Sequence, residues 1–216
     1  MKSKIRIGTL LVMSFLFISQ ASYGSETNKK EELERIVTEA EDKGAVIDIN
    51  YENIDYESLN LENIETELLM LTSIPKEIIL DPINIDENNS NIMPAARDEY
   101  VKVLTAQYKY RGDKDINGRS YRYDTIIHVD YDCLFNYSGK AIRIEKINDA
   151  YATQVNYSFG VSFSQKGSII PTRISDSQIN LRGKGRYTVG VGSIGGAHYD
   201  VEYFCTVRAG NKGVQY

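Results

Sequence analysis

Residues 111–124, RGDKDINGRSYRYD, match a known ligand-binding pattern in residue type and spacing better than any other stretch of the sequence does. Asp113, Asp115, Asn117, Gly118 and Asp124 fall at positions 1, 3, 5, 6 and 12 of the twelve-residue calcium-binding loop. Oxygen ligands at alternate positions can surround a hard cation, and glycine permits the sharp bend between them. The stretch therefore predicts a weak calcium site with Asp113, Asp115, Asn117 and Asp124 as ligands.

An ordinary turn competes with the calcium interpretation. The Asn117-Gly118 dipeptide favours a tight hairpin turn for reasons of backbone geometry alone. Tyrosines at 108 and 110 mirror those at 121 and 123, which predicts that Tyr110 faces Tyr121 across a hairpin. The tripeptide at 111–113 also matches a cell-adhesion motif, although three residues do not establish how the motif is displayed.

Both histidines occur in the same short pattern. HVDYD and HYDVE each place a histidine and two acidic residues at alternate positions: His128, Asp130 and Asp132, and His198, Asp200 and Glu202. Alternate residues of a strand project from one face, so each trio could offer an imidazole and two carboxylates to a metal ion. The same alternation is typical of the solvent-facing side of a half-buried strand.

The two cysteines, Cys133 and Cys205, each fall on the apolar phase of a predicted strand. In a secreted chain without a third cysteine we expect them to form a disulfide. The bond would close a loop of about 72 residues and contribute about 4 kcal/mol to the free energy of unfolding. The run YDVEYFC, with Tyr203 two places before Cys205, resembles the tyrosine corner of immunoglobulin domains, and this resemblance implies a sandwich.

No catalytic motif is recognisable. GVGSIG spaces Gly190, Gly192 and Gly195 as in a dinucleotide-binding loop, but a predicted strand follows where that fold needs a helix. We therefore expect a hairpin tip there. Neither histidine lies near a serine or cysteine in a nucleophile motif. The sequence predicts no catalytic residue and, calcium aside, no cofactor, while a pair of carboxylates for glycoside hydrolysis stays open.

From residue 98 onward the sequence is typical of β-strands. Val, Ile, Thr and Tyr are frequent, and turns containing glycine interrupt the chain at short intervals. Apolar residues alternate strictly with polar or small ones in VNYSFGVSFS, which predicts one strand over 155–164. About eight strands are expected, at 100–110, 120–131, 139–146, 155–164, 168–174, 178–182, 185–191 and 198–208. This density predicts a mainly β fold, an antiparallel β-sandwich or barrel.

The preceding region is acidic and partly helical. Residues 25–100 hold 20 acidic and 6 basic residues, a net charge of −14, whereas residues 101–216 have a net charge of +6. One helical stripe is formed by Leu33, Ile36, Val37 and Ala40, and a second short helix is predicted over 61–71. A linker rich in Asn and Asp ends near residue 98. Short helices are only marginally stable in isolation, so this region must either dock on another part of the protein or remain mobile.

The first 24 residues predict secretion. Lys2, Lys4 and Arg6 precede a 12-residue apolar run, and small residues follow up to a cleavage point after Gly24 or, alternatively, after Ala21. The run is too short to span a bilayer comfortably. We therefore expect a signal peptide over 1–24, an acidic arm or pro-segment over 25–97, and a β-sandwich domain over 98–216.

Three classes of function fit this organisation. Of the 16 tyrosines, 13 lie from residue 100 onward, and tyrosine supplies rigid contact surfaces, so the first class is a secreted binding protein for an extracellular protein or glycan. The second is a membrane-active, pore-forming type of protein masked by an acidic pro-segment, with residues 155–164 or 188–197 inserting as part of a closed barrel. The third is an extracellular hydrolase. A mature net charge of −8 argues against a nucleic-acid partner.

Overall fold

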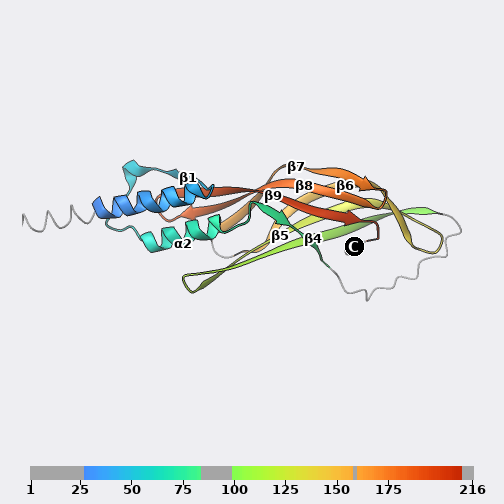
Figure 1. Cartoon of the computed structure of the whole chain (residues 1–216), viewed down its shortest axis with the longest axis horizontal. Coiled ribbons are helices and arrows are strands. Elements are labelled where there is room, and N and C mark those ends of the chain that lie inside the picture. The colour runs from blue at the N-terminus through green and yellow to red at the C-terminus, as the bar shows by residue number, and fades with distance from the viewer. Residues whose placement is uncertain (1–26, 84–98, 158–159, 211–216) are drawn as a thin grey trace, which may run out of the picture.

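Two antiparallel sheets form the body of the protein (Figure 1). The computed structural model describes residues 27–83, 99–157 and 160–210; the predicted signal peptide and most of the predicted linker lie outside them. The four-stranded sheet contains, in order, β3 (Asp81–Pro82), β4 (Tyr100–Ile116), β5 (Arg119–Phe135) and β6 (Ala141–Tyr157). The five-stranded sheet contains β1 (Val46–Ile49), β9 (Gly195–Arg208), β8 (Gln178–Val191) and β7 (Val161–Ser175), and β2 (Glu77–Ile79) lies parallel to β9. The predicted mainly β, antiparallel fold is confirmed.

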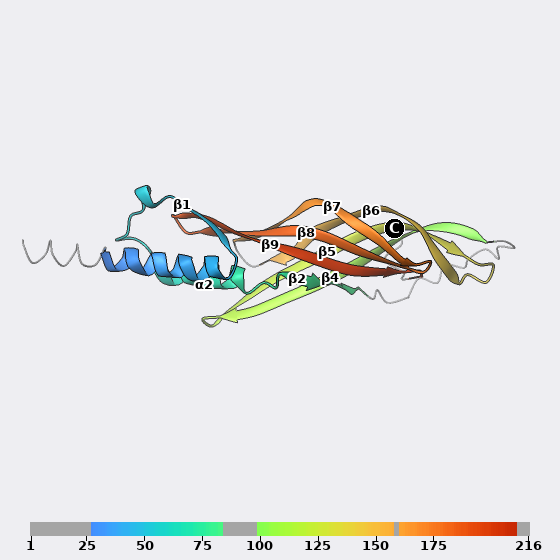
Figure 2. The same cartoon turned by 45° about the horizontal axis from the view of Figure 1, so that its top comes forward.

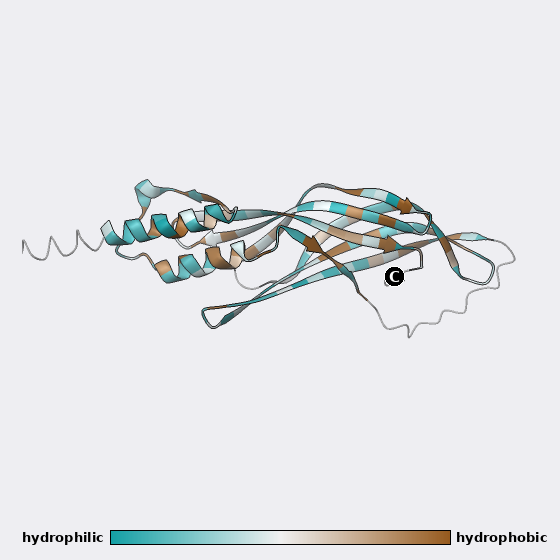
Figure 3. Ribbon diagram, in the orientation of Figure 1, coloured by the Kyte–Doolittle hydropathy of each residue, from teal (hydrophilic) through white to brown (hydrophobic). Residues whose placement is uncertain are grey.

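The strands are unusually long. β4, β5 and β6 have 17 residues each, against a typical strand of about 5 to 6. Apolar and polar residues alternate along them, as the colours in Figure 3 show, because one face of each sheet covers the core. In β8, for example, Ile179, Leu181 and Tyr187 are buried while Asn180, Arg182 and Lys184 are exposed.

Two glycines explain why β8 is one strand where two were predicted. Aromatic rings cover Gly183 and Gly185 in the core, so these residues do not form a turn. A Cβ at Gly183 would lie 2.1 Å from Tyr203 Cε2, and a Cβ at Gly185 would lie 2.2 Å from Phe163 Cε2. Only glycine lets the rings approach the backbone this closely.

The predicted single strand over 155–164 is instead divided between the two sheets. β6 ends at Tyr157, and β7 begins at Val161 in the other sheet. Gly160 precedes β7 with a φ of +89°, a conformation that residues with a Cβ seldom adopt. The chain therefore crosses from one sheet to the other in the middle of an alternating pattern.

Two helices lie side by side at one end of the molecule, next to β1 (Figures 1 and 2). The first spans residues 27–42, and the second is α2 (Leu61–Thr72); a 3₁₀ turn, η1 (Tyr51–Asn53), follows β1. The first predicted stripe is buried, with Leu33, Ile36, Val37 and Ala40. Of the second, Ile64, Leu68 and Leu71 of α2 are buried, and Leu61 is partly buried against the core. Gly44, with a φ of +97°, follows the first helix. Among the described residues, no helix is both long enough and apolar enough to cross a membrane.

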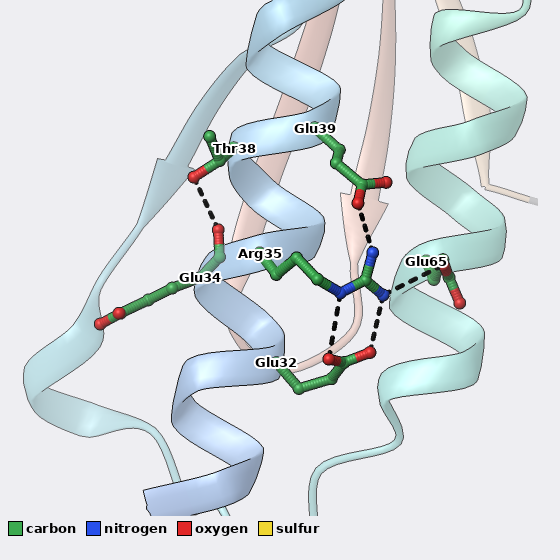
Figure 4. A network of polar contacts seen from close by, with 6 residues as sticks. All are labelled: Glu32, Glu34, Arg35, Thr38, Glu39 and Glu65. Atoms are coloured by element: carbon green, nitrogen blue, oxygen red, sulfur yellow. Dashed lines mark hydrogen bonds and ion pairs between the residues drawn. The ribbon is translucent and has the colours of Figure 1, made fainter.

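A polar network joins the outer sides of the two helices (Figure 4). Arg35 of the first helix pairs with Glu32 and Glu39 of the same helix and lies 3.6 Å from Glu65 of α2. These side chains are half-exposed, so the pairs stabilise the contact only slightly. Burial of Leu33 and Leu71 contributes more.

The acidic region docks on the β region through three short strands that were not predicted. β1 and β2 pair with β9, and β3 pairs with β4. Ile78 of β2 is 1% exposed, and the Leu80 amide donates to the Phe204 carbonyl oxygen over 2.8 Å. Segments of two to four residues are too short to show a period of two. The region from β1 to β3 thus contributes to both sheets and to the core.

Candidate functional site

The tip of the β4–β5 hairpin is a tight turn. Ile116 pairs with Arg119, and the two residues between them, Asn117 and Gly118, have φ values of 50° and 75°. These positive values belong to the turn type that Asn-Gly favours. The predicted pairing of Tyr110 with Tyr121 is wrong, because Tyr110 faces Thr125. The turn is centred between Asn117 and Gly118, further along the chain than the symmetry of the tyrosines suggests.

The hairpin places one predicted calcium ligand, Asp124, far along the strands from another, Asp115. Asp124 faces Arg111, four residues along β4 from Asp115, which corresponds to about 13 Å. Asp113 pairs with Arg122 over 2.9 Å, and Asp115 accepts a hydrogen bond from Ser120. Asp124 is fully buried and lies 2.8 Å from Lys109 Nζ.

The remaining predicted ligand, Asn117, donates to Thr66 on α2. Within residues 27–83, 99–157 and 160–210, no group of three or more His, Cys, Asp or Glu side chains is placed to hold a metal ion. Calcium binding stays a prediction that a titration can test. Arg111, Gly112 and Asp113 lie within β4, and Gly112 is covered by the ring of Tyr123.

The outer face of the four-stranded sheet carries the first histidine trio, His128, Asp130 and Asp132. All three project from β5 to the same side, as the alternation predicted. Thr105 donates to Asp130 over 2.6 Å, and Asn148 donates to Asp132 over 2.6 Å. Each carboxylate of the trio is thus engaged by a neighbouring strand.

His128 lies at the centre of this face. Its ring stacks on Tyr151 of β6, with centroids 4.8 Å apart and planes 11° apart. Gln107 Nε2 lies 3.3 Å from Nδ1, and Thr153 Oγ1 lies 3.3 Å from Nε2. Burial lowers the pKa of His128, and the charge of Asp130 opposes this shift.

The hydrogen bonds of His128 do not suit a nucleophile and base pair. The Gln107 amide nitrogen can only donate, so it makes Nδ1 an acceptor and places the proton of the neutral ring on Nε2. Nε2 then donates to Thr153 and cannot remove its proton. The arrangement holds the imidazole against the ring of Tyr151.

The second histidine trio, His198, Asp200 and Glu202, lies on β9 in the other sheet. Arg186 Nε pairs with Asp200 over 2.6 Å, and Arg182 pairs with Glu202 over 2.5 Å, both across the β8–β9 ladder. The two trios therefore belong to separate sheets and do not form one site.

The two cysteines are free and buried in the structure, so the expected disulfide is not formed in it. Cys133 lies on β5 and Cys205 on β9, in opposite sheets, and both face the core. Burial raises the pKa of both thiols, that of Cys205 to about 12. Disulfide formation stays a prediction.

The tyrosine corner that YDVEYFC suggested is not formed. Tyr203 is fully buried, but its hydroxyl makes no hydrogen bond with the described residues. The Gly-rich run forms the predicted tip of the β8–β9 hairpin, with Ile194 buried between Gly192 and Gly195.

Nearly half of the 13 tyrosines that suggested a contact surface lie in the core. The six buried tyrosines are Tyr108, Tyr123, Tyr131, Tyr187, Tyr199 and Tyr203. Tyr137 and Tyr151 are exposed by 71% and 44%. Sequence reasoning singled out His128 but missed Tyr151, because cross-strand neighbours cannot be identified before the register is known.

Comparisons with protein-family models, with curated proteins and with solved structures find no match to this chain.

Proposed function

We propose that the mature protein is secreted and binds an extracellular protein through the outer face of the four-stranded sheet. The observation that carries this proposal is the His128–Tyr151 stack at the centre of that face. Hydrogen bonds with Gln107 and Thr153 hold the imidazole in place. A tyrosine ring braced in this way offers a large contact area at little cost in conformational entropy.

The rest of the face supports a protein partner. Val101 and Val103 on β4 are 54% and 62% exposed, and Asp130 and Asp132 lie beside them on β5. Protein interfaces combine aromatic and aliphatic contacts with polar groups in this way. The chain has no tryptophan, the largest aromatic platform on which a sugar could stack, so a glycan partner is less well supported.

The proposal can be tested with a double variant, Val103→Ser with Tyr151→Ala. The matched control is Tyr137→Ala, which removes an exposed tyrosine from the β5–β6 connection. Wild type and both variants are immobilised and exposed to fluid from the organism's surroundings, and bound proteins are identified by mass spectrometry. We expect at least one protein to be retained by wild type and control but lost from the double variant.

A partner retained equally by all three proteins would reject this face as the binding surface. The same proteins applied to a glycan array distinguish the other class of partner. Glycan binding that the double variant loses, without a protein partner, would replace the protein proposal with the glycan one.

A further inference from the structure

A groove of about 610 Å³ lies between the first helix and β1, at the helical end of the molecule. Its apolar part is formed by Val37 of the helix, Ile47 of β1 and the ring of Tyr51, which is 41% exposed. This groove belongs to the five-stranded sheet, so it is separate from the proposed binding face on the other sheet.

One wall of the groove is a sheet edge. β1 is the terminal strand of its sheet and pairs with β9 antiparallel, from Val46 opposite His198 to Ile49 opposite Gly195. Among the described residues β1 has no strand partner on its other side. Every second backbone N–H and C=O group of an edge strand is available to another extended chain, which is the basis of recognition by strand addition.

The groove also carries a concentrated negative charge. Glu34 and Glu41 line it from the helix and Asp48 lines it from β1, against a single cation, Lys30, which lies 3.9 Å from Glu34. Burial raises the pKa of Tyr51, and the charges of Glu34 and Glu41 raise it further.

The opposite side of the first helix has its own cluster of charges. There Arg35 pairs with Glu32 and Glu39 and lies 3.6 Å from Glu65, whereas Glu34 projects away from Arg35 (Figure 4). Glu34 is therefore outside the Arg35 network and lies on the groove side of the helix.

We propose that this groove binds an extended basic segment of another protein, which adds to the free edge of β1 as a further strand. Lysine or arginine side chains at alternate positions would lie against Glu34 and Glu41 on the side that faces the helix, with their alkyl stems on Val37, Ile47 and Tyr51. The intervening small side chains would project to the opposite face of the strand, beside Asp48. Backbone hydrogen bonds to β1 supply affinity, and the charge complementarity selects basic over acidic segments.

The probe for this proposal is a blocked hexapeptide of alternating lysine and valine, labelled with a fluorophore and titrated with the full mature chain. We expect saturable binding that weakens as salt is raised, and no binding of the corresponding glutamate and valine peptide. The double variant Glu34→Gln with Glu41→Gln should bind the basic peptide about tenfold more weakly, since each exposed pair contributes a small energy.

The matched control is Glu57→Gln with Glu62→Gln, which removes the same charge from exposed positions outside the groove. Its affinity should equal that of wild type. Equal weakening in both double variants would show attraction to the net charge alone and would overturn the proposal.

Backbone pairing is tested separately with two peptides that are N-methylated either on every lysine or on every valine. A strand that adds to one edge directs alternate N–H groups toward it, so one methylation pattern should abolish binding and the other should preserve it. If both peptides bind as well as the parent, or neither binds, strand addition to β1 is wrong.

Discussion

Asn117 Nδ2 donates a hydrogen bond of 3.0 Å to Thr66 Oγ1, so the tip of the β4–β5 hairpin is attached to helix α2. Thr66 is 4% exposed, and Ile116, next to Asn117, is 8% exposed. A stretch whose composition suggested a calcium loop thus takes part in packing between the acidic region and the β region.

Replacement of Asn117 separates its two structural roles. Asn117→Gly keeps the positive φ of 50° but loses the hydrogen bond, and should reduce the free energy of unfolding by about 1 kcal/mol. Asn117→Ala should reduce the free energy of unfolding by about a further 1 kcal/mol, because residues with a Cβ, other than Asn and Asp, are strained at positive φ. Urea unfolding measures both values. Equal stabilities of the two variants would show that backbone strain plays no part.

Gly183 and Gly190 form a matched pair on β8. Gly183→Ala should destabilise the protein by about 1 to 3 kcal/mol, because the new Cβ meets the fully buried ring of Tyr203 at 2.1 Å. Gly190→Ala meets no heavy atom within 4 Å and should change stability by less than about 1 kcal/mol. Thermal unfolding of both variants gives the comparison. A harmless Gly183→Ala would mean that Tyr203 packs elsewhere.

Thiol titration tests the state of Cys133 and Cys205. Because both are buried and burial raises their thiol pKa values, we expect no labelling of the native protein and labelling of two thiols in denaturant. If denaturant alone releases no thiol and a reductant releases both, the disulfide predicted from the sequence has formed. Mass spectrometry under non-reducing conditions distinguishes the two states directly.

Limited proteolysis tests how firmly the acidic region is held. A cut between residues 83 and 99 should leave two fragments that remain together in gel filtration, since β2 pairs with β9, β3 pairs with β4, and Leu68 and Ile78 are 1% exposed. The fragments should separate in denaturant. A folded C-terminal fragment that elutes alone would show that the acidic region is dispensable, as a removable pro-segment requires.

Stability should decrease on mild acidification because of the histidines. Burial lowers the pKa of His128, and burial with the charge of Arg186 lowers that of His198. The unfolded chain therefore binds protons first as the pH falls below about 6.5. The free energy of unfolding that the two neutral histidines contribute is fully present above about pH 6.5. It is lost as the pH falls from that value to the lowered pKa values of the folded state.

The variant His128→Gln should show a smaller decrease in melting temperature between pH 7.5 and 5.5 than wild type does. A constant difference between the two proteins across this range would show that the pKa of His128 is not lowered by folding. NMR titration of the imidazole protons gives an independent value.

The sequence alone determined the local features of this protein. The strand-rich composition from residue 98 onward predicted the mainly β class, and a period of two predicted the shared face of His128, Asp130 and Asp132. A period near 3.6 predicted the buried stripe of Leu33 and Ile36. The Asn117-Gly118 turn was also predictable. These features depend on residues a few positions apart, so a short stretch contains all the information that they need.

Which distant residues meet depends on how the sheets and helices pack together. The tertiary structure placed Tyr151 beside His128, put six tyrosines in the core, divided residues 155–164 between two sheets, and gave Asp113 and Asp124 cationic partners. Strand order and register depend on the packing of whole sheets, and a one-residue shift would turn every side chain to the other face. No periodicity within a single strand carries that information, because it arises from contacts between segments far apart in the chain.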